Sequence, residues 1–261
     1  NQKPPNAILS GLVGSEMCIR DRKTKDVEMG PAGIVSDAAN KLSRRQIAWL
    51  VANEIPDGAY VNLGIGIPTL CADHMPSEKE ILLHSENGVL GFGPRPEEGD
   101  EDSDLVNAGK QPITMLNGGS YFVHSDAFGM IRGGHIDIAM LGAFEVSGEG
   151  DLANWTTNNP TFPPGVGGAM DLAAGAKEVW VLTEHQTKGG NPKIVNKCSY
   201  PLTSAKCVKR VFTDLAIMSI GDGELTVEGM IEGMTIEELQ RRTEPKLRLS
   251  SSSKVLVAPD L

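Results

Sequence analysis

Short apolar runs alternate with segments of helical periodicity along most of the chain. The first helix is expected to begin near Ser43, a suitable N-cap, because apolar residues from Leu42 to Val51 recur at helical spacing; the Pro-Asp-Gly sequence at 56–58 ends it. Further strands are expected over residues 59–63, 81–84, 113–116, 136–141, 178–183, 211–218 and 224–227, and further helices over residues 69–74, 125–132, 170–176 and 235–239. This alternation predicts an α/β fold with an open, largely parallel sheet and flanking helices.

The two ends of the chain fall outside this pattern. The sequence Glu-Met-Cys-Ile-Arg-Asp at 16–21 is what the read-through of a sequencing adapter would encode, so residues 1–22 are expected to be a disordered sequencing or assembly scar. A cleaved targeting segment is the alternative. Residues 23–40 are polar and rich in glycine, which predicts a flexible lead-in. We expect a single domain over residues 41–249 and a C-terminal tail over residues 250–261.

Composition narrows the functional classes. The chain has 261 residues, with 34 acidic against 24 basic side chains and a net charge of −10, which argues against a general nucleic-acid binder but leaves room for a local basic pocket. The four cysteines form no C-x-x-C pair, which favours a reduced, cytoplasmic setting. No apolar run reaches the roughly 18 residues that a membrane helix needs. The 30 glycines indicate places where the backbone approaches a ligand or itself closely.

Glu86 is the first candidate for chemistry. It follows an apolar strand and is itself followed by Asn87 and Gly88. Ligand crevices form at the carboxyl ends of strands in open α/β sheets, and a carboxylate there can act as a base, a metal ligand or a nucleophile. A solvated glutamate in a turn is the alternative interpretation.

Two glycine-rich loops are the second candidate. Gly64-Ile65-Gly66 lies between a strand and a helix but lacks the third glycine of a dinucleotide fingerprint, which disfavours a Rossmann cofactor site. The loop at 164–171 (Pro-Gly-Val-Gly-Gly-Ala-Met-Asp) opens a helix, where free N–H groups can form an anion site or an oxyanion hole; a tight turn without a ligand is the alternative. The five histidines lack metal-site spacing, and no G-x-S-x-G motif is present, so neither a metal site nor a serine hydrolase is predicted.

Several motifs together resemble a known family. The sequence at 85–91 (Ser-Glu-Asn-Gly-Val-Leu-Gly) is similar to the S-E-N-G-x-x-G signature of the B subunit of class I 3-oxoacid CoA-transferases, and the sequence at 62–68 (Asn-Leu-Gly-Ile-Gly-Ile-Pro) is similar to their N-L-G-I-G-x-P loop. Four further runs match in family order: Asn107–Lys110, Met130–His135, Gly150–Trp155 and Gly167–Leu172. The resemblance extends from about Leu42 to about Arg242.

The resemblance implies a fold, a mechanism and a set of site residues. The fold would be the one that CoA-transferases share with sugar isomerases. Glu86 would be the nucleophile that takes coenzyme A from succinyl-CoA as a glutamyl-CoA thioester, so coenzyme A would be substrate and covalent intermediate with no permanently bound cofactor and no metal. The residues expected to form the oxyanion hole or contact coenzyme A are Asn62, Gly64, Gly66, Lys110, Gly167 and Gly168.

The resemblance also implies partners and an acceptor. The B chain would work only with an A subunit, in a heterotetramer or larger assembly, without nucleic acid or membrane. The His-Ser-Glu-Asn-Gly run at 84–88 and the runs at 141–147 and 200–203 look most similar to enzymes that use 3-oxoadipate in aromatic degradation. Acetoacetate enzymes share most of the motifs and remain the alternative. A non-catalytic binding module on the same fold is the second alternative.

Overall fold

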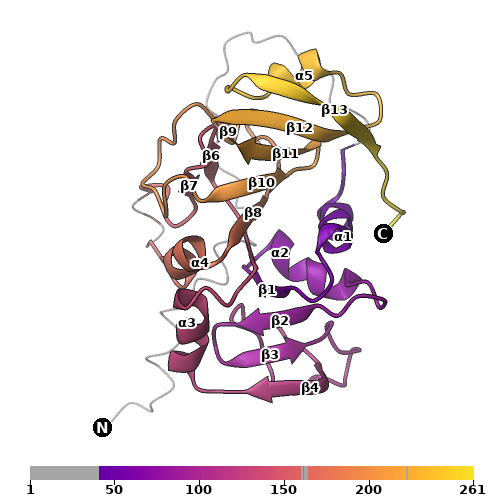
Figure 1. The fold of residues 1–261 in the computed structure, drawn as a ribbon, viewed down its shortest axis with the longest axis vertical. Coiled ribbons are helices and arrows are strands. Elements are labelled where there is room, and N and C mark those ends of the chain that lie inside the picture. The colour runs from indigo at the N-terminus through magenta and orange to yellow at the C-terminus, as the bar shows by residue number, and fades with distance from the viewer. Residues whose placement is uncertain (1–40, 160, 162–163, 222) are drawn as a thin grey trace.

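The computed structural model describes residues 41–159, 161, 164–221 and 223–261 (Figure 1). The expectations for residues 1–22 and 23–40 lie outside the described residues. The domain boundaries proposed from the sequence stay predictions.

A ten-stranded sheet forms the framework of the molecule. Its strands are β1 (Tyr60–Leu63), β2 (Leu82–Ser85), β3 (Val89–Phe92), β4 (Met115–Tyr121), β5 (Ile138–Leu141), β8 (Glu178–Leu182), β10 (Val208–Phe212), β11 (Ala216–Gly221), β12 (Glu224–Ile231) and β13 (Leu247–Leu256). They lie in the order β13-β12-β11-β10-β8-β5-β1-β2-β3-β4. The five central strands from β10 to β2 run parallel, antiparallel pairs flank them on both sides, and β12 and β13 are again parallel. The predicted open, largely parallel sheet is confirmed.

The remaining elements cover this sheet or extend from it. A small second sheet has the order β7-β6-β9. Its strands are β6 (Glu145–Ser147), β7 (Leu152–Ala153) and β9 (Ile194–Val195). The helices are α1 (Arg44–Glu54), α2 (Ile67–Leu70), the 3-10 helix η2 (Cys71–His74), α3 (His124–Arg132), α4 (Ala169–Gly175) and α5 (Ile236–Gln240).

Helices lie on both faces of the parallel strands. In β5, Ile138 and Met140 pack into the same core as the buried side of α1, whereas Ala139 and Leu141 pack into the core that also contains residues of α3 and α4. Successive side chains of a strand point to opposite faces, so both faces of β5 are buried and the strand is apolar throughout. Figure 1 shows α1 and α2 on one side of these strands and α3 and α4 on the other.

The helix starts agree with the sequence. Ser43 caps α1, because its hydroxyl accepts from the Gln46 N–H while the Gln46 side chain accepts from the Ser43 N–H. Thr235 and Glu238 form the same capping box at α5. Local hydrogen-bonding chemistry therefore sets these helix starts.

The strands were predicted less completely. The single strand expected over 211–218 is wrong: it consists of β10 and β11, separated by a tight turn at 213–215 in which the Thr213 hydroxyl accepts from the Leu215 and Ala216 N–H groups. The turn is buried, and the sequence runs through it without a glycine or proline signal. Five strands had no counterpart in the prediction: β3, β6, β7, β9 and β13. Strand β13 continues past residue 250, so part of the C-terminal segment pairs with the sheet.

Candidate active site

Glu86 lies in the tight turn between β2 and β3, at the carboxyl end of a central parallel strand. The turn is closed by the Gly88 N–H, which donates to the Ser85 carbonyl at 3.0 Å. Gly88 has a φ of +104°, and a Cβ there would lie 2.1 Å from the carbonyl oxygen of Phe122. Only glycine fits this position, so the turn that presents Glu86 depends on it.

Asn62 holds one oxygen of the Glu86 carboxylate. It lies near the end of β1, directly opposite His84 of β2 in the parallel register, and it is fully buried. Its Nδ2 donates to Glu86 Oε2 at 3.0 Å and lies 3.2 Å from the His84 carbonyl oxygen. Two neighbouring strands therefore place the amide and the carboxylate side by side.

Gly168 lies against the other oxygen of the same carboxylate. A Cβ built on Gly168 would be 3.1 Å from Glu86 Oε1, so the loop before α4 approaches the carboxylate closely because a side chain is missing there. Gly167 is exposed and has a φ of +53°, the left-handed region that glycine favours. The structure thus brings Glu86 and the second glycine loop together, although they are about eighty residues apart in the sequence.

Two residues of α3 that were not predicted from the sequence support the Glu86 turn. His124 Nδ1 donates to the backbone carbonyl of Glu86 at 2.8 Å, and its ring lies 4.7 Å from the Phe128 ring. Phe128 in turn lies 3.5 Å from the place where a Gly168 Cβ would be. No local motif marks these residues, because α3 reaches the turn only through the tertiary fold.

His84 was also missed. It is almost completely buried, and desolvation lowers the pKa of its imidazole to about 4. Its Nδ1 lies 3.1 Å from Asn62 Nδ2. The alternation of side chains along a strand could have identified His84 as a neighbour of the site, because a residue two positions before Glu86 points to the same side of the strand.

The first glycine loop and Lys110 lie near the same edge of the sheet. The Gly64 N–H donates to the Met140 carbonyl at 2.8 Å, so this glycine allows β1 and β5 to approach closely. Gly66, with a φ of +101°, is the N-cap of α2. Lys110 is exposed and ends a turn whose Ala108 N–H donates to the Ser85 hydroxyl at 2.9 Å, which anchors the turn beside the Glu86 strand.

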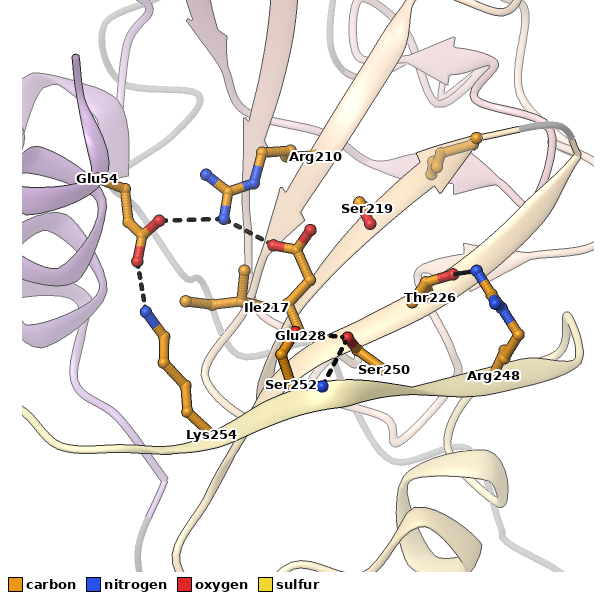
Figure 2. Close-up of a pocket in the computed structure, with 12 residues that line it drawn as sticks. Glu54, Arg210, Ile217, Ser219, Thr226, Glu228, Arg248, Ser250, Ser252 and Lys254 are labelled. Carbon is orange, nitrogen blue, oxygen red and sulfur yellow. Dashed lines mark hydrogen bonds and ion pairs between the residues drawn. The ribbon is translucent and has the colours of Figure 1, made fainter.

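A cavity of about 480 Å³ lies elsewhere, between α1 and the strands β10 to β13 (Figure 2). Figure 2 shows that four of its charged groups are paired with one another, because Arg210 bridges Glu54 and Glu228 and Lys254 bonds Glu54. Arg248 instead donates to the Thr226 hydroxyl. These ion pairs join α1 to the strands, so the cavity resembles a structural junction more than a reaction site, although the buried Nε of Arg210 has no hydrogen-bond partner among the described residues.

No group of three or more His, Cys, Asp or Glu side chains able to hold a metal ion occurs among the described residues. No helix in the described part of the chain has the length and apolar character needed to cross a membrane.

Comparisons with known proteins support a family assignment. The model of the family described as coenzyme A transferase matches residues 44–242. The chain is 56% identical to the B subunit of the 3-oxoadipate CoA-transferase of Acinetobacter baylyi over 204 residues, which are 78% of this chain and 94% of that protein. It is 49% identical to the B subunit of a probable succinyl-CoA:3-ketoacid coenzyme A transferase of Bacillus subtilis, over 81% of this chain and 98% of that protein.

Solved structures of low sequence identity share the fold. An acyl-CoA transferase of Escherichia coli O157:H7 superposes with a TM-score of 0.62 at 16% identity, covering 85% of this chain and 44% of that chain. Glutaconate coenzyme A-transferase of Acidaminococcus fermentans superposes with a TM-score of 0.57 at 17% identity, covering 85% of this chain and 91% of that chain. The extent of the family match and the identity to these relatives establish that the chain belongs to the coenzyme A transferase family.

Proposed function

We propose that this chain is the B subunit of a CoA-transferase that moves coenzyme A from succinyl-CoA to a 3-oxo acid, with Glu86 as the nucleophile. The observation that carries the proposal is the environment of the Glu86 carboxylate. Asn62 binds Oε2, whereas Oε1 faces Gly168 and accepts no hydrogen bond from the residues that the structure describes. A carboxylate held at one oxygen and open at the other is suited to nucleophilic attack.

The reaction proceeds through four acyl transfers. Glu86 Oε1 attacks the thioester carbonyl of succinyl-CoA, the C–S bond breaks, and a mixed anhydride and CoA thiolate form. The thiolate attacks the Glu86 carbonyl carbon, which releases succinate and leaves a glutamyl-CoA thioester. The carboxylate of the 3-oxo acid then displaces the thiolate, and the thiolate attacks the acceptor's acyl carbon to give 3-oxoacyl-CoA and free Glu86. The thioester energy is retained at every step because water does not take part.

Each attack creates a tetrahedral oxyanion that needs hydrogen-bond donors. The backbone N–H groups of Gly167 and Gly168 precede α4 and donate to no described acceptor. They belong to the loop that lies against Glu86 Oε1, so we assign the oxyanion site to them. Gly66 and Lys110 would contact coenzyme A at the rim of the site, with the lysine charge available to a phosphate.

A partner subunit would complete the site. Large apolar side chains are exposed around Glu86: Ile65 in the first glycine loop, Val123 beside Gly88, and Met170 two residues after Gly168, each with about half or more of its surface exposed. Exposed apolar groups around a polar centre are typical of a protein–protein interface. We assign this face to an A subunit, because the relatives are named as B subunits.

The acceptor is proposed to be 3-oxoadipate. The support is the 54–56% identity to subunits that carry this acceptor in their names, against 49% for a 3-ketoacid enzyme. Assays of the reconstituted complex with 3-oxoadipate and with acetoacetate, each with succinyl-CoA as donor, separate the two. A higher kcat/KM for acetoacetate would contradict the assignment.

Glu86→Ala in the complex with the A subunit tests the mechanism. We expect at least about a thousandfold loss of kcat, because the group that forms the covalent intermediate is removed. Borohydride treatment after incubation with succinyl-CoA should modify residue 86 in the unaltered complex only. Glu78→Ala, at an exposed glutamate outside the site, is the matched control and should keep full activity. Substantial transfer by Glu86→Ala would refute the proposal.

A further inference from the structure

The amide of Asn62 has more acceptors within reach than it has hydrogens. Its Nδ2 lies 3.0 Å from Glu86 Oε2, 3.2 Å from the His84 carbonyl oxygen and 3.1 Å from His84 Nδ1. The nitrogen carries two hydrogens, so one bonds the carboxylate and the other is shared between the two acceptors of His84. Asn62 Oδ1 is buried and has no partner among the described residues. The orientation of the amide is therefore fixed only from its nitrogen side.

The imidazole of His84 must be neutral to serve as one of these acceptors. Nδ1 accepts a hydrogen bond only when the ring proton is on Nε2. Burial favours the neutral ring and lowers the pKa of His84 to about 4, although the nearby Ala127 backbone acts in the opposite direction. Nε2 is buried and has no hydrogen-bond partner among the described residues. The ring also stacks on Phe122, with centroids 6.0 Å apart and planes inclined by 22°. The acceptor is therefore present at neutral pH and held in place.

The orientation of the Asn62 amide decides which oxygen of Glu86 is free. With nitrogen toward the carboxylate, Oε2 is bound and Oε1 remains on the Gly168 side. If the amide turned over, its oxygen would face the carboxylate, and repulsion would move Glu86 away from Gly168. A misplacement of about 1 Å at a nucleophile can cost about a hundredfold in rate.

We propose that His84 is a positioning residue for Glu86: by accepting a hydrogen bond from Asn62, it fixes the amide orientation that binds Glu86 Oε2 and presents Oε1 for attack. This inference rests on the proposed role of Glu86 as nucleophile. No hydrogen bond joins His84 to Glu86 among the described residues, so in this proposal it acts through Asn62.

A double-mutant cycle in the complex with the A subunit tests this indirect action. His84→Phe keeps the ring and its contact with Phe122 but removes the acceptor, and we expect kcat to fall about fivefold to tenfold with KM for succinyl-CoA unchanged. Asn62→Ala should lower kcat about 10-fold to 100-fold. His84→Phe added to Asn62→Ala should cause no further loss. Full additivity of the two losses would overturn the inference.

A rescue variant separates positioning from packing. His84→Asn places an oxygen the same number of bonds from the backbone as Nδ1, so it restores the acceptor while losing the ring, and kcat should stay within about threefold of the unaltered complex. Equal impairment in His84→Asn and His84→Phe would contradict the inference. If His84→Phe fails to assemble, His84→Leu replaces it in the same comparison.

A control isolates the effect of losing a buried histidine. His185 is as buried as His84 but bonds Thr213 and Thr243, away from the Glu86 turn. His185→Phe should lower stability and leave kcat per assembled site unchanged. The two possible failures give different results. If the proposed function is wrong, transfer survives Glu86→Ala. If only the role of His84 is wrong, transfer still depends on Glu86, but the double-mutant cycle or the His84→Asn rescue fails.

Discussion

The two oxygens of the Glu86 carboxylate lie in different environments. Oε2 is bound by a buried amide, and Oε1 lies beside a residue without a side chain. The type of residue at each position fits this arrangement. An amide donor can stabilise the carboxylate without adding charge, and in the proposed reaction a glycine leaves room for the incoming thioester carbonyl. The proposed role of Gly168 therefore depends only on the absence of a side chain beside Glu86 Oε1.

Gly168→Ala tests that role. The added Cβ would lie 3.1 Å from Glu86 Oε1 and 3.5 Å from Phe128, while the φ of −82° suits any residue, so folding should be little affected. We expect kcat to fall about 10-fold to 100-fold because the nucleophilic oxygen is displaced or covered. Gly165→Ala, in the same loop with open space around its Cβ, should stay near full activity. Equal activities of the two variants in the transfer assay would show that Oε1 does not need this space.

The sequence located part of this site in advance. Glu86 and the glycines at 167 and 168 stand in motifs whose residues are contiguous, so a linear pattern finds them. His84 directly precedes the Glu86 motif, but its contact with Asn62 depends on the pairing of β1 with β2. His124 and Phe128 belong to no such motif, because α3 meets the turn only in the folded chain. His84 contacts Asn62, His124 bonds the Glu86 carbonyl, and Phe128 packs against the His124 ring.

At the level of elements, the β2–β3 turn is the most constrained piece of the site. Its Gly88 combines a positive φ with a carbonyl group in the space a Cβ would occupy. The hairpin partner β3 was not predicted, although Asn87-Gly88, a strong hairpin-turn signal, directly precedes the short apolar run at 89–92. The turn geometry is thus a property of the hairpin and its contact with Phe122.

Gly88→Ala should therefore destabilise the fold far more than the same substitution at Gly99. We expect a loss of more than about 3 kcal/mol in the free energy of unfolding, since the Cβ would lie 2.1 Å from the Phe122 carbonyl oxygen. Gly99→Ala has a similar φ of +97° but open space, so it should cost only about 1 kcal/mol. Denaturant unfolding of both variants measures the difference, and equal losses would mean that the backbone conformation alone matters.

Over the whole molecule, one arginine links the first helix to the last strands (Figure 2). Arg210 bonds Glu54 of α1 and Glu228 of β12 and stacks over Trp180 and Phe212 at about 5 Å from each ring centroid. Lys254 of β13 bonds the same Glu54 carboxylate. The network joins segments that are 200 residues apart in sequence.

Arg210→Met should destabilise the fold by about 2 kcal/mol, because it leaves Glu228 without its cation in a partly buried place. Lys254→Met removes a more exposed cation and should cost less than about 1 kcal/mol. Thermal unfolding compares them, and transfer activity at about 25 °C should be unchanged in both, since neither contacts the Glu86 site. A larger effect from Lys254→Met would contradict this ranking.

Two buried histidines should make the stability of the molecule depend on pH. Desolvation lowers the pKa of His185 to about 3 and that of His84 to about 4, whereas in the unfolded chain both titrate near 6.5. Below about pH 6.5 the unfolded state binds more protons, so the free energy of unfolding falls as the pH falls toward these lowered values. Each histidine contributes a slope of about 1 kcal/mol per pH unit near pH 5.5.

Replacing one of these histidines should remove its contribution to the pH dependence of the free energy of unfolding. Denaturant unfolding of His185→Gln between about pH 7 and pH 5 should decline less steeply than that of the unaltered chain, by about 1 kcal/mol per pH unit. His135→Gln, at an exposed histidine, is the control and should leave the slope unchanged. Identical slopes for His185→Gln and the unaltered chain would show that His185 titrates normally.

The sequence by itself determined the alternation of strands and helices, the helix caps at Ser43 and Thr235, and the contiguous motifs around Glu86 and Gly168. These are local properties, set by side-chain periodicity, by hydrogen bonds within a few residues and by backbone freedom at glycine. Tertiary structure alone decided that Asn62 binds Oε2 and lies against His84, that His124 bonds the Glu86 turn, and that Arg210 joins α1 to β12. Those contacts depend on strand order and register, which bring distant residues within about 3 Å through pairings that a linear pattern does not specify.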